Sequence, residues 1–215
     1  DRAYQTAREN HVCFMVAQVL RFWPEYELIK ELYDSGRYGK LLSGYMGRLN
    51  GYPKWSWDDW MLDEARSGLI PFDLHIHDLD FCVYAFGAPT DVQEKRVKLP
   101  KQDYISAVYQ FPGFFITTES SWYSAPYPFT ASFRFLFEKA LVAWEGGKCL
   151  IYQNDGQILD LSTESLNDTG DIDLPQTNAY AEEIRYFTDC VKEGRFPDKV
   201  KPEELKQVLH ILNAL

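Results

Sequence analysis

This chain of 215 residues is 46% hydrophobic and 25% charged, which is typical of a folded globular domain and not of a disordered segment. Its formal net charge of −10 argues against nucleic acid and anionic membrane surfaces as partners, because both are bound through basic patches. The sequence also has no apolar run long enough to cross a membrane and no signal-peptide pattern at its start.

The first part of the chain is predicted to mix helices with strands. Pro24 stands where a helix can begin and Ser35-Gly36 where it can end, and Ser67-Gly68 and Pro71 break the chain before another helix. In chain order, the apolar pattern predicts a helix over 2–10, a strand over 12–17, a helix over 25–34, a strand between 39 and 51, an aromatic loop over 55–60 and a helix over 72–86.

After residue 87 the pattern changes to short segments rich in Val, Ile, Phe, Tyr and Thr, separated by turn residues such as Gly146-Gly147 and Asn154-Asp155-Gly156. These segments predict strands near 90–98, 103–111, 114–121, 130–137, 140–144, 148–152 and 157–161, then a loop over 162–176 and helices over 178–193 and 202–213. We therefore expect an α+β fold with a sheet of about seven or eight mostly antiparallel strands, covered by helices on one face.

The four cysteines, Cys13, Cys82, Cys149 and Cys190, are far apart in the sequence. Cys13 and Cys82 have apolar neighbours, which is typical of buried thiols and not of a disulfide framework. A cytoplasmic location is therefore expected.

The segment Asp73-Leu-His75-Ile-His77-Asp78-Leu-Asp80 holds the densest set of chemically active side chains. On a helix, Asp73 and His77 are four residues apart and share a face, so the carboxylate can orient the imidazole and raise its pKa. This arrangement would hold His77 ready as a general acid/base for a substrate hydroxyl.

Two other interpretations of the same segment remain open. On a strand, His75 and His77 would share a face and form a metal-binding pair, but the histidine that usually completes such a run is absent. The segment could also be an acidic amphipathic helix without chemistry, although five ionisable groups within eight residues are many for that purpose.

Other candidate residues carry weaker signals. Arg21 could bind an anion or pair with a core carboxylate, and Asp63 could bind a polyol or cap a helix. Trp55, Trp57, Trp60 and Trp122 could line a carbohydrate pocket or belong to the core. The sequence has no Gly-x-Gly motif, so no dinucleotide-binding fingerprint lies in this chain.

Taken in order, several motifs resemble the C-terminal domain of the glucose–fructose oxidoreductase/inositol dehydrogenase (Gfo/Idh/MocA) family. They extend over nearly the whole chain, and the ordered set is more specific than any one member. The matching stretches are Val16–Phe22, Pro24–Leu32 leading to Ser35–Gly39, Trp60-x-x-Asp63, Ser67-Gly68, Asp73-x-x-x-His77-x-x-Asp80 running to Gly87, and Tyr180–Ile184 followed by Phe187 and Gly194.

The resemblance implies a dihydrodipicolinate reductase-like C-terminal domain that binds substrate and forms a homo-dimer or tetramer through its sheet. It implies hydride transfer between NAD or NADP, bound by a separate Rossmann domain, and a sugar or polyol carbon. His77 would be the proton-transferring residue and Asp73 its partner, and the pocket would be bordered by Arg21, Trp60, Asp63 and Trp122. No cofactor or metal is expected on this chain itself.

The sequence departs from the family pattern at two points. Gly68 is followed by Leu69-Ile70-Pro71 where the family often has further glycines, and the Rossmann domain with its Glu-Lys-Pro lysine is absent from this chain. Residues 1–18 are therefore expected to be the remnant edge of the missing domain, and residues 19–215 the substrate-binding and oligomerisation domain. We expect the chain alone to be inactive. The alternative is a non-catalytic binding or assembly module with the same fold.

Overall fold

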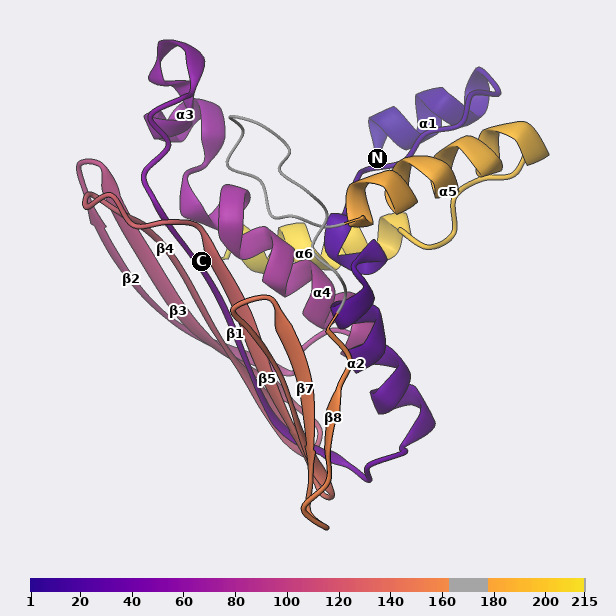
Figure 1. Ribbon diagram of the computed structural model, residues 1–215. Coiled ribbons are helices and arrows are strands. Elements are labelled where there is room, and N and C mark those ends of the chain that lie inside the picture. Colours follow the sequence, from indigo (N-terminus) through magenta and orange to yellow (C-terminus); the bar gives the residue numbers. More distant parts are fainter. Residues whose placement is uncertain (163–177, 215) are drawn as a thin grey trace.

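The computed structural model describes residues 1–162 and 178–214. A single large sheet forms one layer, and the helices lie against one of its faces (Figure 1). The predicted α+β architecture is confirmed, and no doubly wound Rossmann sheet is present among the described residues.

Eight strands form the sheet in the order β2-β3-β4-β1-β5-β6-β7-β8. Within the described ranges β1 and β4 pair in parallel, and every other neighbouring pair is antiparallel. The strands are β1 Leu41–Gly51, β2 Asp91–Leu99, β3 Gln102–Phe111, β4 Phe114–Tyr123, β5 Thr130–Phe137, β6 Ala140–Glu145, β7 Lys148–Gln153 and β8 Ile158–Asp160.

The two faces of the sheet differ because successive side chains of a strand point to opposite sides. One row across the sheet points into the core and is buried: Tyr109, Ile116, Gly44, Phe135, Val142 and Ile151. A Cβ atom on Gly44 would lie 2.7 Å from the Phe135 ring, so this glycine makes room for the aromatic side chain. The next row points away from the helices and includes Phe115, Leu136 and Tyr152, all exposed.

The helices are α1 Arg2–Glu9, α2 Pro24–Ser35, α3 Glu64–Ser67, α4 Ile76–Phe86, α5 Ala179–Glu193 and α6 Pro202–Leu212. Helix α2 begins at Pro24 and is terminated after Ser35 by Gly36, whose φ of 61° places it in the left-handed region that glycine adopts without cost. Its Tyr26 is fully buried and packs edge-on against Phe81 of α4 and Phe133 of β5. This aromatic cluster joins both helices to the sheet.

Most predicted elements are present with ends shifted by one to three residues, including both hairpin turns. The predicted strand over 12–17 is wrong: these residues pair with no strand in the described structure, and Val12 is 53% exposed. A strand needs a neighbour to complete its backbone hydrogen bonds, and none of the strands of the described sheet pairs with this segment. The predicted loop over 162–176 lies outside the described residues except for Ser162.

The predicted helix over 178–193 is present as α5, and two of its apolar side chains are exposed. Ile184 is 64% exposed and Val191 51%, whereas the neighbouring Glu183 is buried and accepts a hydrogen bond from the Gln18 backbone N–H. None of the helices in the described parts of the chain is both long and apolar enough to span a membrane.

Candidate functional site

A cavity of about 220 Å³ opens where the amino-terminal turn of α4 meets the ends of β1 and β4. Its floor comes from the sheet and its walls from the loop after β1 and from the helices. The lining side chains are Val19, Trp23, Arg48, Asn50, Pro53, Trp55, Met61, Asp73, Leu74, His77, Trp122, Phe129 and Tyr180.

A turn of π-helix, Pro71–His75, leads directly into α4 and sets the directions of the side chains in the 73–80 cluster. Gly68 precedes this turn with φ of 74°, and a Cβ there would lie 2.4 Å from the Phe72 ring. Glycine is thus required at this position for its backbone and for its size. The resulting helix points Asp73 and His77 to the cavity and buries His75, Asp78 and Asp80 in the core.

Asp73 lies at the wall of the cavity, and its carboxylate accepts a hydrogen bond of 3.2 Å from Trp122 Nε1. Burial raises the pKa of Asp73 to about 6, while the Trp122 hydrogen bond and the charge of Arg48 act in the opposite direction. The carboxyl therefore titrates close to neutral pH, where a group can exchange protons with a substrate.

This raised pKa predicts a pH-dependent effect of Asp73→Asn on stability. The unfolded carboxyl ionises near its ordinary value of 3.8 and the folded one near 6, so folding loses stability as pH rises through that window. Asparagine keeps an acceptor for Trp122 without the charge. We expect the variant to gain about 1–3 kcal/mol over the wild type at about pH 7.5 and less at about pH 5 in urea denaturation. A variant that is destabilised more at the higher pH would contradict the burial of this charge.

His77 faces the same cavity, and its Nδ1 atom is buried with no hydrogen-bond partner among the described residues. Burial lowers the pKa of His77 to about 3, and the positive charge of Arg48 adds to this shift. The imidazole is consequently neutral at physiological pH and has a nitrogen lone pair that can accept a proton. The expected hydrogen bond between His77 and Asp73 is not formed among the described residues, and the Asp73 carboxylate accepts from Trp122 instead. The expectation that Asp73 raises the pKa of His77 is therefore wrong, because burial dominates and lowers it.

Behind His77 lies an ion pair that sequence reasoning missed. Arg48 Nη2 donates to Asp78 Oδ1 at 2.9 Å and to the Tyr26 hydroxyl at 3.1 Å, and all three residues are buried. The sequence does contain a signal for this pair. Arg48 lies on a strand with the apolar residues Met46 and Leu49, and a charge buried among apolar residues needs a carboxylate partner. Asn50 also lines the cavity and was missed because no motif marks it, and Tyr180, which begins one of the stretches that resemble the family, lines it as well.

The other predicted site residues are distributed unevenly around the cavity. Trp122 lines it, but Arg21, Trp60 and Asp63 do not. Arg21 is fully buried and donates to Asp80 Oδ2 at 2.9 Å and Oδ1 at 2.7 Å, so its guanidinium is occupied by an internal ion pair. Asp63 caps α3 by accepting a hydrogen bond of 3.0 Å from the Ala65 backbone N–H.

The metal-binding interpretation finds no matching geometry. His75 lies in the core, with Nε2 2.6 Å from the Tyr109 hydroxyl and Nδ1 3.3 Å from Ser120 Oγ, and does not share a face with His77. Across residues 1–162 and 178–214, no three His, Cys, Asp or Glu side chains are grouped so as to hold a metal ion.

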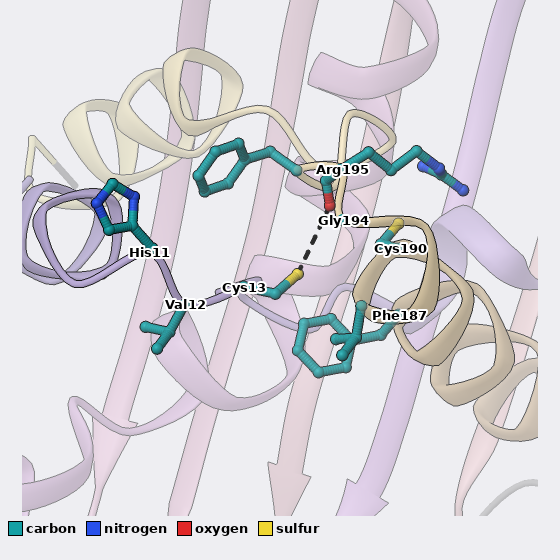
Figure 2. A pocket seen from close by; sticks show the side chains of 9 residues that line it. His11, Val12, Cys13, Phe187, Cys190, Gly194 and Arg195 are labelled. Atoms are coloured by element: carbon teal, nitrogen blue, oxygen red, sulfur yellow. Dashed lines mark hydrogen bonds between the residues drawn. The ribbon is translucent and has the colours of Figure 1, made fainter.

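A second cavity of about 580 Å³ lies between the segment after α1 and the end of α5 (Figure 2). Cys13 and Cys190 line it as free thiols, and Cys13 Sγ lies 3.9 Å from the backbone oxygen of Arg195. No carboxylate lines this cavity, and His11 is its only imidazole among the described residues. The cavity beside α4 is therefore the better candidate for acid–base chemistry.

Comparison with protein-family models identifies one domain type in the chain. Residues 26–143, more than half of the chain, match the GFO/IDH/MocA C-terminal domain, and this stretch includes Arg48, Asn50, Asp73, His77 and Trp122. No curated protein sequence gives a significant match to the chain.

Solved structures share the fold at low sequence identity. A levoglucosan dehydrogenase in complex with NADH and levoglucosan has a TM-score of 0.78 at 15% identity, over 98% of this chain and 65% of that one. An oxidoreductase from Agrobacterium radiobacter in complex with NAD+, L-tartaric acid and magnesium has a TM-score of 0.73 at 18% identity, over 98% and 64%. A UDP-N-acetylglucosamine 3-dehydrogenase from Acidithiobacillus ferrooxidans has 0.70 at 17%, over 99% and 63%. The chain thus spans just under two thirds of the length of these proteins.

Proposed function

The chain belongs to the GFO/IDH/MocA family, of which it carries the C-terminal domain, and on that premise we propose that it is the substrate-binding part of an NAD(P)-dependent oxidoreductase. The substrate is a sugar or polyol whose carbon exchanges a hydride with the nicotinamide. The described residues contain no Gly-rich turn for a dinucleotide, so a separate domain would hold the cofactor. This chain supplies the residues that bind and orient the substrate and move its proton.

The observation that carries the proposal is the convergence of His77, Asp73 and Asn50 on one cavity. The neutral imidazole of His77 accepts the hydroxyl proton as the carbon is oxidised and returns it in the reverse direction. Asp73, one helical turn earlier, lies on the same cavity and favours the imidazolium that forms. The Asn50 amide has no side-chain partner among the described residues and is free to bind sugar hydroxyls.

A contact with the cofactor-binding domain is proposed for the uncovered face of α5 and the segment beside it. Ile184 and Val191 on α5 are exposed, as are Val12 and Val16 on the segment after α1. Figure 2 shows that the segment after α1 and the carboxyl-terminal end of α5 enclose the second cavity, which Phe187 also lines. Exposed apolar groups of this kind are typical of an interface with another domain.

Ligand binding tests the pocket assignment. A panel of neutral sugars and polyols, including glucose, galactose, mannose and inositol, is expected to raise the Tm of the complete protein, because a ligand that binds only the folded state stabilises it. Asn50→Ala removes one hydrogen-bonding group and should weaken binding roughly three- to tenfold. Asn213→Ala is the matched control, since Asn213 is an exposed residue at the end of α6.

If Asn50→Ala and Asn213→Ala weaken sugar binding equally, or if neither weakens it, the substrate does not bind in this cavity. Binding that depends on Asn50 but is never accompanied by turnover would favour the alternative, a non-catalytic binding module. A cytoplasmic location is part of the proposal and is supported by the four free thiols, of which Cys82, Cys149 and Cys190 are buried.

We also propose that the outer face of the sheet joins two copies of the chain. Phe115, Leu136 and Tyr152 lie in one row across β4, β5 and β7, and all are exposed. Leu136→Arg places a charge in the middle of this row and should convert a dimer or tetramer to a smaller species in light scattering. Leu209→Arg on α6, which changes an exposed residue on the helical side of the molecule, is the control. An unchanged mass for Leu136→Arg would exclude this face as the interface.

A further inference from the structure

Three tryptophans lie close together on the segment that follows β1, beside α3 at the end of the sheet (Figure 1). Trp57 is 81% exposed, Trp55 72% and Trp60 36%. Tryptophan is highly buried on average, so two indole rings this exposed within three residues form an unusual surface feature. The core does not explain their presence, because none of the three belongs to a buried cluster.

The backbone between the first two rings directs both of them outward. Ser56 has an extended conformation with φ of −70° and ψ of 129°, and its side chain is buried. In extended backbone, alternate side chains point to the same side, so Trp55 and Trp57 share the outer side and Ser56 points inward. Trp55 also lines the α4 cavity, so the exposed surface is continuous with the proposed substrate pocket.

The two residues that follow Trp57 have a strained backbone conformation. Asp58 and Asp59 have φ of 54° and 46°, a conformation that residues with a side chain rarely adopt. Arg66 holds the turn by pairing with the Asp58 carboxylate at 3.2 Å. Strained residues persist where the surrounding structure enforces them and are concentrated at functional sites. Here the turn leaves Asp59 exposed, and no side-chain partner for its carboxylate exists among the described residues.

Two exposed indole rings and a free carboxylate match the chemistry of an uncharged sugar ring. The apolar C–H face of a sugar packs on an aromatic ring, and its hydroxyls donate hydrogen bonds to a carboxylate. Asp59 is exposed next to the two rings and has no ion-pair partner among the described residues, so it repels a phosphate or carboxylate group placed beside it. Two residues of extended chain span roughly 6–7 Å, which is comparable to one sugar unit.

We propose that Trp55, Trp57 and Asp59 form an outer subsite for a second, uncharged sugar ring. The substrate class is then a neutral disaccharide or glycoside, with the reacting ring in the α4 cavity and the linked ring on the tryptophans. This inference rests on the proposed function and specifies the substrate of the same site.

The test compares dissociation constants in the complete protein. The monosaccharide that binds best in the panel is measured beside neutral disaccharides that contain it, such as maltose, cellobiose or lactose, and beside its 1-phosphate. The disaccharide is expected to bind roughly three- to tenfold more tightly than the monosaccharide, and the phosphate no more tightly. In Trp57→Ala the ratio of the two constants should fall to about one, and Trp57→Phe should restore most of it because it keeps an aromatic face.

The outcomes separate this inference from the proposed function. If no mono- or disaccharide binds the wild type, the proposed function fails and the subsite fails with it. If monosaccharides bind in an Asn50-dependent way but disaccharides show no advantage, or keep it in Trp57→Ala, the subsite alone is wrong. A Trp57→Ala variant that changes the oligomeric mass instead of the ratio would assign the tryptophans to a contact between copies and overturn the subsite.

Discussion

Replacing His77 by alanine in the complete protein is expected to lower kcat/KM by roughly 10²–10⁴-fold, the usual contribution of a general acid/base. The structure supports this size of effect because His77 is the one imidazole that lines the α4 cavity among the described residues. Burial lowers the pKa of His77, so the imidazole is neutral at physiological pH and can accept the hydroxyl proton while the carbon is oxidised. Without the imidazole the proton must leave to water.

The matched control is His210→Ala, which makes the same change on the exposed side of α6, away from the cavity. Its kcat/KM should equal that of the wild type. The Tm of each variant shows whether the fold is kept, and removal of an imidazole with an unpartnered buried Nδ1 is not expected to lower it much. A loss of less than about tenfold for a folded His77→Ala would remove His77 from the chemistry.

Arg21→Met is expected to destabilise the protein by about 3–5 kcal/mol, the range found when one partner of a buried ion pair is removed. Arg21 and Asp80 are both fully buried, and Arg21 also pairs with Glu204 and donates a 2.9 Å hydrogen bond to the Lys199 backbone oxygen. The variant leaves the Asp80 carboxylate buried without its counter-charge. Burial already raises the pKa of Asp80, and the arginine opposes that shift.

Urea denaturation checks this prediction, with Arg185→Met on α5 as the control, because Arg185 forms an exposed pair with Glu182 whose loss should cost about 0–1 kcal/mol. If Arg21→Met fails to fold, the double variant Arg21→Met, Asp80→Leu removes both charges and should recover much of the stability. A stable Arg21→Met with an increased KM would instead show that Arg21 binds substrate, as the family resemblance implied.

The sequence predicted the second half of the fold well because its signals are local. Alternating strands such as β3 and β5 carry their burial pattern in consecutive residues, and turns such as Gly146-Gly147 adopt the left-handed conformations that glycine favours. The segment 12–17 carries the same apolar signal, but a strand also needs a neighbouring strand, which its own residues do not specify.

The candidate site was predictable where its residues are close in sequence. Asp73 and His77 share a helical face because of their spacing, and the π-helical turn before α4 does not alter that result. Arg48 and Asn50 reach the same cavity from β1, and only the register of β1 with β4 brings Asn50 beside Trp122. Arg21 shows the opposite case, since a motif arginine proved to be paired with Asp80.

Hydride transfer by the complete protein tests the central claim most directly. The protein would be mixed with NAD+ or NADP+ and with the same neutral sugars, polyols and disaccharides, and reduced nicotinamide and oxidised carbohydrate would be quantified together. The account predicts that at least one carbohydrate yields the two products in equal amounts, and that His77→Ala suppresses both. A carbohydrate that binds in an Asn50-dependent way while neither cofactor is ever reduced would contradict the account.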